Sequence, residues 1–192
     1  QPFNGYYVRI LGDELQQQVG NAIRVGENRS LFSENGLVLS ANGTILAVSH
    51  ARHPRDDYNE LWITPLFEVD IYRLDPSTAT WRSMGNITLQ GSTQDDDFGM
   101  ALAMNDEGTL LAVGAPSDET SSIKAGRVAT FQWDDEAGQW LPFADLLGEA
   151  DSAFGSSVAL LPSGNQLLVG APQNDMNGED SGQAFLYTVV GV

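Results

Sequence analysis

The chain has 192 residues, 42% of them hydrophobic, which is enough for a globular protein with a substantial core. Nine lysine and arginine residues against 26 aspartate and glutamate residues give a formal net charge of -17. This balance argues against partners that need clustered positive charge on the protein, namely nucleic acid and anionic membrane surfaces. There is no cysteine, so disulfides, thiolate metal sites and cysteine nucleophiles are excluded too.

The N-terminal half predicts short strands separated by turn residues. Strands at 6–11 and 16–25 are interpreted as the last two strands of a preceding unit, which occupies residues 1–30. A second unit spans 31–97, where Asn42-Gly43 marks a tight hairpin and an insertion is expected at 50–67. Its later strands are expected at 69–74 and 80–89.

The C-terminal half contains two copies of one sequence motif. Phe98-Gly99 opens a unit of four strands over 98–153, and Phe154-Gly155 opens a second unit over 154–192 that stops after its third strand. In both units a second apolar strand ends in Gly-Ala-Pro. The spacing between equivalent positions, here called the repeat period, is the same from Gly108 to Gly164, from Pro116 to Pro172 and from Gly126 to Gly182. A fixed period of this kind predicts a repeat architecture.

Four short antiparallel strands in each unit predict an all-β fold of β-propeller blades. The chain contains about three such blades, whereas closed propellers typically have about four to eight. We therefore expect a partial propeller, or one that is completed by another chain.

The paired Phe-Gly and Gly-Ala-Pro motifs resemble the FG-GAP repeats of integrin-alpha-like β-propellers. That resemblance implies an interaction module, and calcium in an acidic turn between the first two strands of a blade. Here the corresponding turns, 105–108 and 162–165, are short and poor in carboxylates, whereas calcium takes about six to eight oxygen ligands. The better calcium candidate is another loop, with Asp175, Asn177, Glu179 and Asp180 as ligands; the alternative is a solvated connection.

The sequence shows no set of residues that is typical of a catalytic site. His50 and His53 are the only histidines and fall in the predicted insertion, where surface positions are expected rather than a metal pair. No serine lies in a nucleophile elbow, and no glycine-rich phosphate loop follows a strand. The aromatic residues Tyr58, Trp62 and Phe67 in and around the insertion are candidates for contact with a partner.

Three glycosylation acceptor patterns begin at Asn28, Asn42 and Asn86. They favour a secreted or cell-surface protein. The leading functional hypothesis is a non-catalytic extracellular propeller module for adhesion or protein assembly. Its partner would be a protein, a glycan, a neighbouring copy or the rest of a larger propeller. Two alternatives remain: a structural subunit completed by strand addition, and a carbohydrate-binding or carbohydrate-active propeller.

Overall fold

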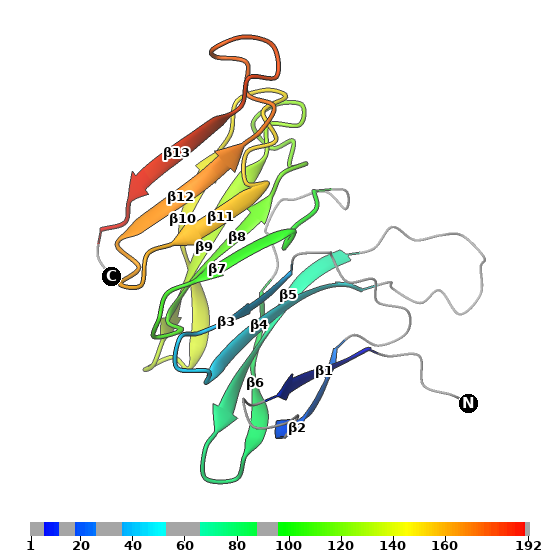
Figure 1. Ribbon diagram of the computed structural model, residues 1–192, viewed down its shortest axis with the longest axis vertical. Helices are drawn as coiled ribbons and strands as arrows, with labels where there is room; N and C mark the ends of the chain where they lie inside the picture. Colours follow the sequence, from blue (N-terminus) through cyan, green and yellow to red (C-terminus); the bar gives the residue numbers. More distant parts are fainter. Residues whose placement is uncertain (1–5, 12–17, 26–35, 53–65, 88–95, 191–192) are drawn as a thin grey trace, which may run out of the picture.

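A computed structural model describes residues 6–11, 18–25, 36–52, 66–87 and 96–190 of the chain (Figure 1). Every regular secondary-structure element within these ranges is a β-strand, so the predicted all-β class is confirmed. The described ranges contain no helix that is long and apolar enough to cross a membrane.

The strands form four antiparallel sheets in the described residues. The first sheet has two strands, β1 (Tyr6–Leu11) and β2 (Gln18–Val25). The second consists, in spatial order, of β3 (Leu37–Leu39), β4 (Ile45–Arg52), β5 (Leu66–Asp75) and β6 (Thr80–Ile87). Each of these strands pairs with its neighbour in the sequence, as in a meander.

The third and fourth sheets repeat this order. The third consists of β7 (Ala101–Met104), β8 (Leu110–Ala115), β9 (Arg127–Asp134) and β10 (Gln139–Leu147). The fourth consists of β11 (Ser157–Leu160), β12 (Gln166–Ala171) and β13 (Gln183–Thr188). Four-stranded antiparallel sheets of this kind are consistent with propeller blades. In the fourth sheet, which has three described strands, β13 is an edge strand.

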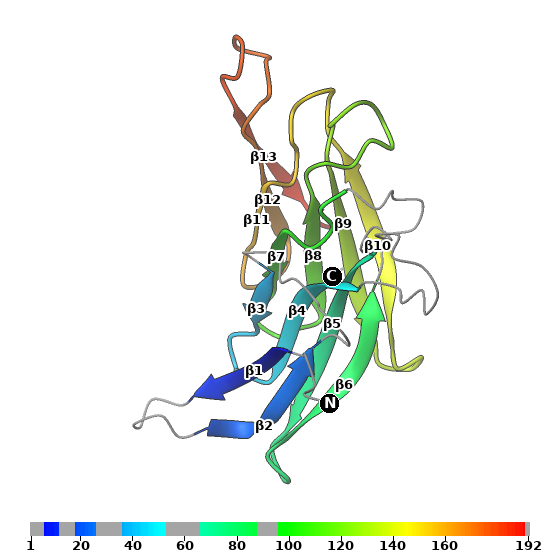
Figure 2. The ribbon, with the colours of Figure 1, turned by 90° about the vertical axis from the view of Figure 1, so that its right-hand side faces the viewer.

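Consecutive sheets stack face to face in an open row that does not close into a ring (Figures 1 and 2). An apolar cluster fills each of the three interfaces. Trp81 anchors the cluster between the first two sheets, and its ring Nε1–H donates to the carbonyl oxygen of Val19 at 3.1 Å. Each sheet therefore depends on its immediate neighbours for the burial of its apolar faces.

The alternation of side chains along β8 explains how one strand serves two interfaces. Leu111 and Val113 pack in the cluster shared with the β3–β6 sheet, whereas Ala112 packs in the cluster shared with the β11–β13 sheet. Successive side chains of a strand point to opposite faces of the sheet. The small residue thus leaves room for the next sheet, and the large ones fill the space toward the preceding sheet.

Two glycines, Gly114 in β8 and Gly126 just before β9, allow the backbone of the next unit to approach closely. A side chain at Gly114 would overlap the carbonyl oxygen of Gly155, and one at Gly126 would overlap that of Phe154. Phe154 itself is 1% exposed. The Phe-Gly segment at the start of each C-terminal unit therefore packs its sheet closely against the preceding sheet.

The structure corrects the position of the insertion in the second unit. β4 continues through Arg52 and β5 begins at Leu66, so that residues 50–52 and 66–67 of the expected insertion are paired strand residues. The apolar pattern ends at Val48, but backbone hydrogen bonding does not depend on side-chain polarity and extends the ladder further. His50 consequently lies in a strand and is 3% exposed, so its expected surface position was wrong.

Candidate functional site

The outer face of the β11–β13 sheet exposes aliphatic side chains. Leu168 is 45% exposed and Leu186 is 64% exposed, although both lie in the middle of their strands. On the opposite face of the same sheet, Leu167 and Val169 are buried against the β7–β10 sheet. The sheet is therefore apolar on both faces, and the described residues cover only one of them.

The edge of this sheet is also open. In the preceding sheet β10 pairs along β9, but no described strand pairs along the far side of β13. The Val189 N–H donates to the Asn165 carbonyl oxygen at 2.8 Å. Because inward and outward N–H groups alternate along an antiparallel edge strand, those of Ala184, Leu186 and Thr188 point away from β12. Such groups are free to pair with a strand from another chain.

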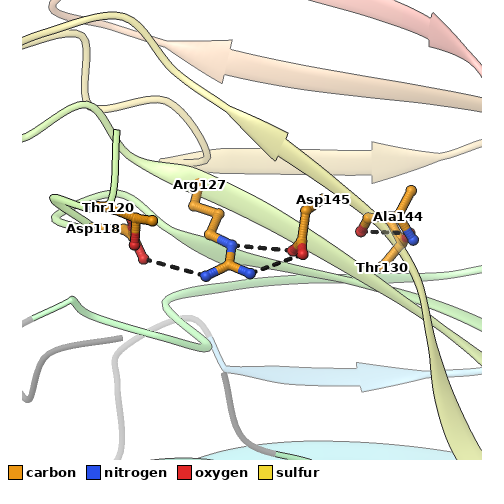
Figure 3. Close-up of polar contacts among 6 residues, drawn as sticks. All are labelled: Asp118, Thr120, Arg127, Thr130, Ala144 and Asp145. Carbon is orange, nitrogen blue, oxygen red and sulfur yellow. Dashed lines mark hydrogen bonds and ion pairs between the residues drawn. The ribbon is translucent and has the colours of Figure 1, made fainter. Parts of the chain in front are cut away.

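A partly buried ion-pair cluster joins the loop after β8 to strands β9 and β10 (Figure 3). The Arg127 guanidinium binds the Asp145 carboxylate through two contacts. Its Nε lies 3.0 Å from Oδ1, and its Nη2 lies 2.8 Å from Oδ2. Its Nη1 faces Oδ2 of Asp118 at 3.9 Å, and the Asp118 side chain is only 1% exposed. The other oxygen of Asp118 accepts the Thr120 N–H at 2.8 Å, which fixes the loop.

The next repeat replaces this ionic pair with neutral groups at the same positions. Asn174 stands one repeat period after Asp118, and Gln183 stands one repeat period after Arg127. Asn174 keeps the same turn, since its Oδ1 accepts the Met176 N–H at 3.0 Å. In both repeats these two positions lie where a loop leads into the third strand of the unit. The shared hydrogen bond indicates that Asp118 and Asn174 position the loop in their repeats.

A second polar cluster lies across β4 and β5, which sequence reasoning missed. The His50 Nε2 lies 3.0 Å from Oδ2 of Asp70 and 4.0 Å from Oε2 of Glu68. The Tyr72 hydroxyl donates to the same Asp70 oxygen at 3.2 Å. Burial, the negative charge of Asp70 and this hydrogen bond raise the pKa of Tyr72 well above its ordinary value. The period-2 placement of Glu68, Asp70 and Tyr72 was the only sequence signal for this cluster.

The raised pKa of Tyr72 predicts a loss of stability at alkaline pH. The unfolded chain releases the phenolic proton near pH 10, whereas the folded protein retains it, so the free energy of unfolding falls as the pH rises beyond about 10. We expect a Tyr72→Phe variant to lose less stability between about pH 8 and about pH 11 than the unmodified chain. Urea unfolding at both pH values measures this, and equal losses in the two proteins would contradict it.

A groove of about 880 Å³ separates the outer hairpins of the second and third sheets. Its wall includes Arg73, whose guanidinium carbon lies 5.3 Å from the centre of the Trp133 ring, and Arg82, which pairs with Asp75 at 3.2 Å. Hydrogen bonds, led by those from the side chains of Ser77 and Thr78, lower the pKa of Asp75 to about 2. Both guanidinium groups of the groove thus already have partners within the chain.

The residues of the predicted calcium loop lie together on the surface. Asp175, Asn177, Glu179 and Asp180 are all exposed, in the connection between β12 and β13. Oδ1 of Asp175 accepts the Asp180 N–H at 2.7 Å, which closes the loop on itself. In the described part of the chain, this loop included, no three His, Asp or Glu side chains gather in a way that could hold a metal ion. Calcium binding here stays a prediction.

The remaining predicted sites fall into different surroundings. Asn42 lies at the exposed tip of the β3–β4 hairpin, and Asn86 is exposed on β6. Phe67 lies in β5 and is partly buried against the apolar cluster between the second and third sheets. Asn28, His53, Tyr58 and Trp62 lie outside the described residues. Glycosylation and the contact role of the aromatic residues stay predictions.

Comparison with known proteins identifies the last described sheet. Residues 148–187 match the family model of the FG-GAP repeat. No curated protein matches the chain. The matched segment contains Phe154-Gly155, Gly170-Ala171-Pro172 and all of β11–β13 up to Tyr187. Together with the stacked antiparallel sheets, the match indicates a β-propeller-like interaction module. The chain therefore contains an FG-GAP repeat, which comprises the β11–β13 sheet.

Proposed function

We propose that the protein is a non-catalytic extracellular β-propeller module that mediates adhesion or protein assembly. The observation that carries this proposal is the outer face of the β11–β13 sheet, where Leu168 and Leu186 are exposed on a regular sheet. Contiguous exposed apolar surface commonly marks an interaction site. The acidic composition keeps such a module soluble and disfavours binding to anionic partners.

The test is binding of the labelled chain to an array of purified extracellular proteins and glycans. We expect saturable binding that a double variant, Leu168→Glu with Leu186→Glu, reduces at least about tenfold, which corresponds to about 1.4 kcal/mol. The matched control is Leu141→Glu with Leu147→Glu, which changes two exposed leucines of β10 in the same way. No saturable binding, or equal binding by both double variants, would contradict the proposal.

A structural subunit completed by strand addition is the second candidate, and the open edge of β13 favours it. A partner strand would pair with the outward N–H groups of Ala184, Leu186 and Thr188. Thr188→Pro removes one of these donors without touching the hydrogen bond from Val189 to Asn165. If the edge joins copies of the chain, the mass in sedimentation equilibrium rises with concentration, and Thr188→Pro abolishes that rise. A mass independent of concentration counts against this candidate.

The extracellular location rests on the acceptor asparagines. Asn42 is exposed at the tip of the β3–β4 hairpin. Secretion of the chain from a eukaryotic host should give a product whose mass falls on glycosidase treatment. Asn42→Gln should remove one glycan, and a secreted product without any glycan would contradict the assignment.

The carbohydrate-active alternative requires two carboxylates about 5 to 10 Å apart in a cleft. The groove between the second and third sheets has a single carboxylate in its lining, that of Asp75. No observation in the described residues therefore favours glycoside cleavage at this groove.

A further inference from the structure

We infer that the groove between the β5–β6 and β9–β10 hairpins binds a sugar acid, that is, a hydroxylated ring that carries one carboxylate or sulfate group. The guanidinium groups of Arg73 and Arg82 hold the oxyanion, and both residues line the groove. The ring hydroxyls contact Asp75, Ser83 and Gln139 in the same lining. This site is separate from the outer face of the β11–β13 sheet, so the inference goes beyond the proposed function.

The two arginines of the groove lie directly opposite each other. Arg73 in β5 pairs with Arg82 in β6, and like charges at opposite positions of neighbouring strands destabilise a sheet. The blade design does not require this pair, because the third sheet has Gln132 opposite Leu141 at the same place, next to the tryptophan of its last strand. The chain has only nine lysine and arginine residues. Two of them are kept together where strand pairing disfavours it, which points to an anionic ligand.

The partners that the two arginines have within the chain leave N–H groups available. The guanidinium carbon of Arg73 lies 5.3 Å from the centre of the Trp133 ring, a cation–π contact that orients the group. Arg82 meets Asp75 through one contact, Nη2 to Oδ2 at 3.2 Å, and its side chain is 66% exposed. Exposed ion pairs of this kind are weak. Because a guanidinium carries several N–H donors, both groups can still bind an oxyanion.

The groove lies where the preceding interface between sheets is closed. Between the first two sheets the Trp81 ring occupies the space of a side chain at Gly20, and its Nε1–H donates to the Val19 carbonyl oxygen. Gly85 stands in β6 as Gly20 does in β2, each followed by asparagine, yet a side chain at Gly85 would meet no atom within 4 Å. Nε1 of Trp140, the counterpart of Trp81 in the third sheet, is buried without a hydrogen-bond partner among the described residues. The second and third sheets thus leave this space open at the groove.

Asp75 restricts the ligand to one that also carries hydrogen-bond donors. Its carboxylate lines the groove and stays ionised at neutral pH, because hydrogen bonds, led by those from the side chains of Ser77 and Thr78, lower its pKa to about 2. An ionised carboxylate only accepts hydrogen bonds, so it repels an anion that brings no donors. Ser83 and Gln139 add groups that both donate and accept. A ring with hydroxyl groups beside its oxyanion satisfies all three side chains.

The volume and the charge of the molecule favour a small ligand over a long polyanion. The groove of about 880 Å³ falls within the range of small-molecule sites, about 300 to 1,000 Å³. The formal net charge of -17 repels anions, but salt screens charges beyond about 8 Å at physiological ionic strength. A single acidic sugar in the groove therefore interacts mainly with the two arginines. A polyanion would extend over the acidic surface of the rest of the chain.

The experiment is a calorimetric titration of the full chain with glucuronate. We expect saturable binding with a dissociation constant of about 1 mM or lower, as for a ligand of this size that fills its site. The double variant Arg73→Gln with Arg82→Leu should bind at least about tenfold more weakly. It copies Gln132 and Leu141 of the third sheet, so the β5–β6 ladder should be retained.

The matched control removes two positive charges elsewhere. Arg9→Gln with Lys124→Gln changes two exposed side chains and alters the net charge by the same amount, so it should leave glucuronate binding unchanged. If the groove variant proves less stable in urea, Gln139→Glu takes its place. This substitution adds a negative charge to an exposed side chain of the lining at almost constant shape, and it should weaken binding by roughly fivefold.

Three further probes define the chemistry of the ligand. Glucose-6-sulfate should bind through the same arginines, and the tighter of the two acids identifies the oxyanion. Glucose has the hydroxyl groups without the oxyanion, and benzoate has the oxyanion without hydroxyl groups. We expect both to bind at least about tenfold more weakly than the better acid.

Several results would overturn the inference. They are no saturable binding of either acid, binding of glucose or benzoate as tight as that of the acids, and an equal loss in the groove variant and its matched control. A glutamate oligopeptide that binds more tightly than either acid, through the same arginines, would make an acidic peptide the occupant instead. Leu168→Glu with Leu186→Glu should leave glucuronate binding unchanged, so the inference and the proposed function can fail separately.

Discussion

Replacement of Gly114 by alanine is expected to lower the free energy of unfolding by about 3 kcal/mol. The added methyl group would overlap the carbonyl oxygen of Gly155, a backbone atom that cannot rotate away. The Gly155 N–H is also held by the Gly170 carbonyl oxygen at 3.0 Å, so a shift of this segment would disturb β12 as well. The loss would appear in chemical denaturation as a lower midpoint with an unchanged slope.

Gly170→Ala is the matched control for this substitution. It makes the same change at the equivalent position of the next repeat, where only the Ser157 side chain stands in the way and can rotate into solvent. We expect an effect within about 0.5 kcal/mol. Equal losses of unfolding free energy at the two positions would show that removing a glycine from a strand destabilises the protein by itself, without the contact between sheets.

Replacement of Arg127 by glutamine is expected to destabilise the protein by about 3 to 5 kcal/mol. Without the guanidinium, the Asp118 carboxylate stays 1% exposed with no cation beside it. The contact with Asp145 contributes less to this loss, since the Asp145 side chain is 51% exposed and water screens its charge. Urea unfolding of the full chain measures the loss.

The double variant Asp118→Asn with Arg127→Gln gives the matched comparison. It copies the pair Asn174 and Gln183 that the next repeat places at the same positions. We expect it to recover most of the stability lost in the Arg127→Gln variant, because no buried charge is left without a partner. A double variant as unstable as the single one would mean that Arg127 acts through packing rather than through charge.

The strands of the C-terminal half were predictable because their signals are local. The alternation of small and large residues along 101–104 and 157–160, and the glycine of each turn, depend only on neighbours in the sequence. Asn42-Gly43 likewise fixes a hairpin by its own backbone preferences. These features do not depend on what packs above or below the sheet, so they could be predicted correctly from one sequence.

The polar clusters were not predictable by the same means. His50, Asp70 and Tyr72 meet because β4 pairs with β5 across the insertion, which no local pattern shows. The pairing of Asp118 with Arg127 did leave a signal, since both change to neutral amides together in the next repeat. A comparison of the two repeats for paired changes of charge would have revealed this contact.

The residues at the interface between neighbouring sheets also limit which repeat units can follow one another in the chain. If residues 98–153 were deleted, Phe154-Gly155 would follow the second unit directly, and the β11–β13 sheet would have to pack on the β3–β6 face where Ile71 and Ala129 now share a cluster. Phe185 stands one repeat period after Ala129, so a large side chain would replace a small one against this face. The units therefore share a backbone design, but their side-chain volumes do not make them interchangeable.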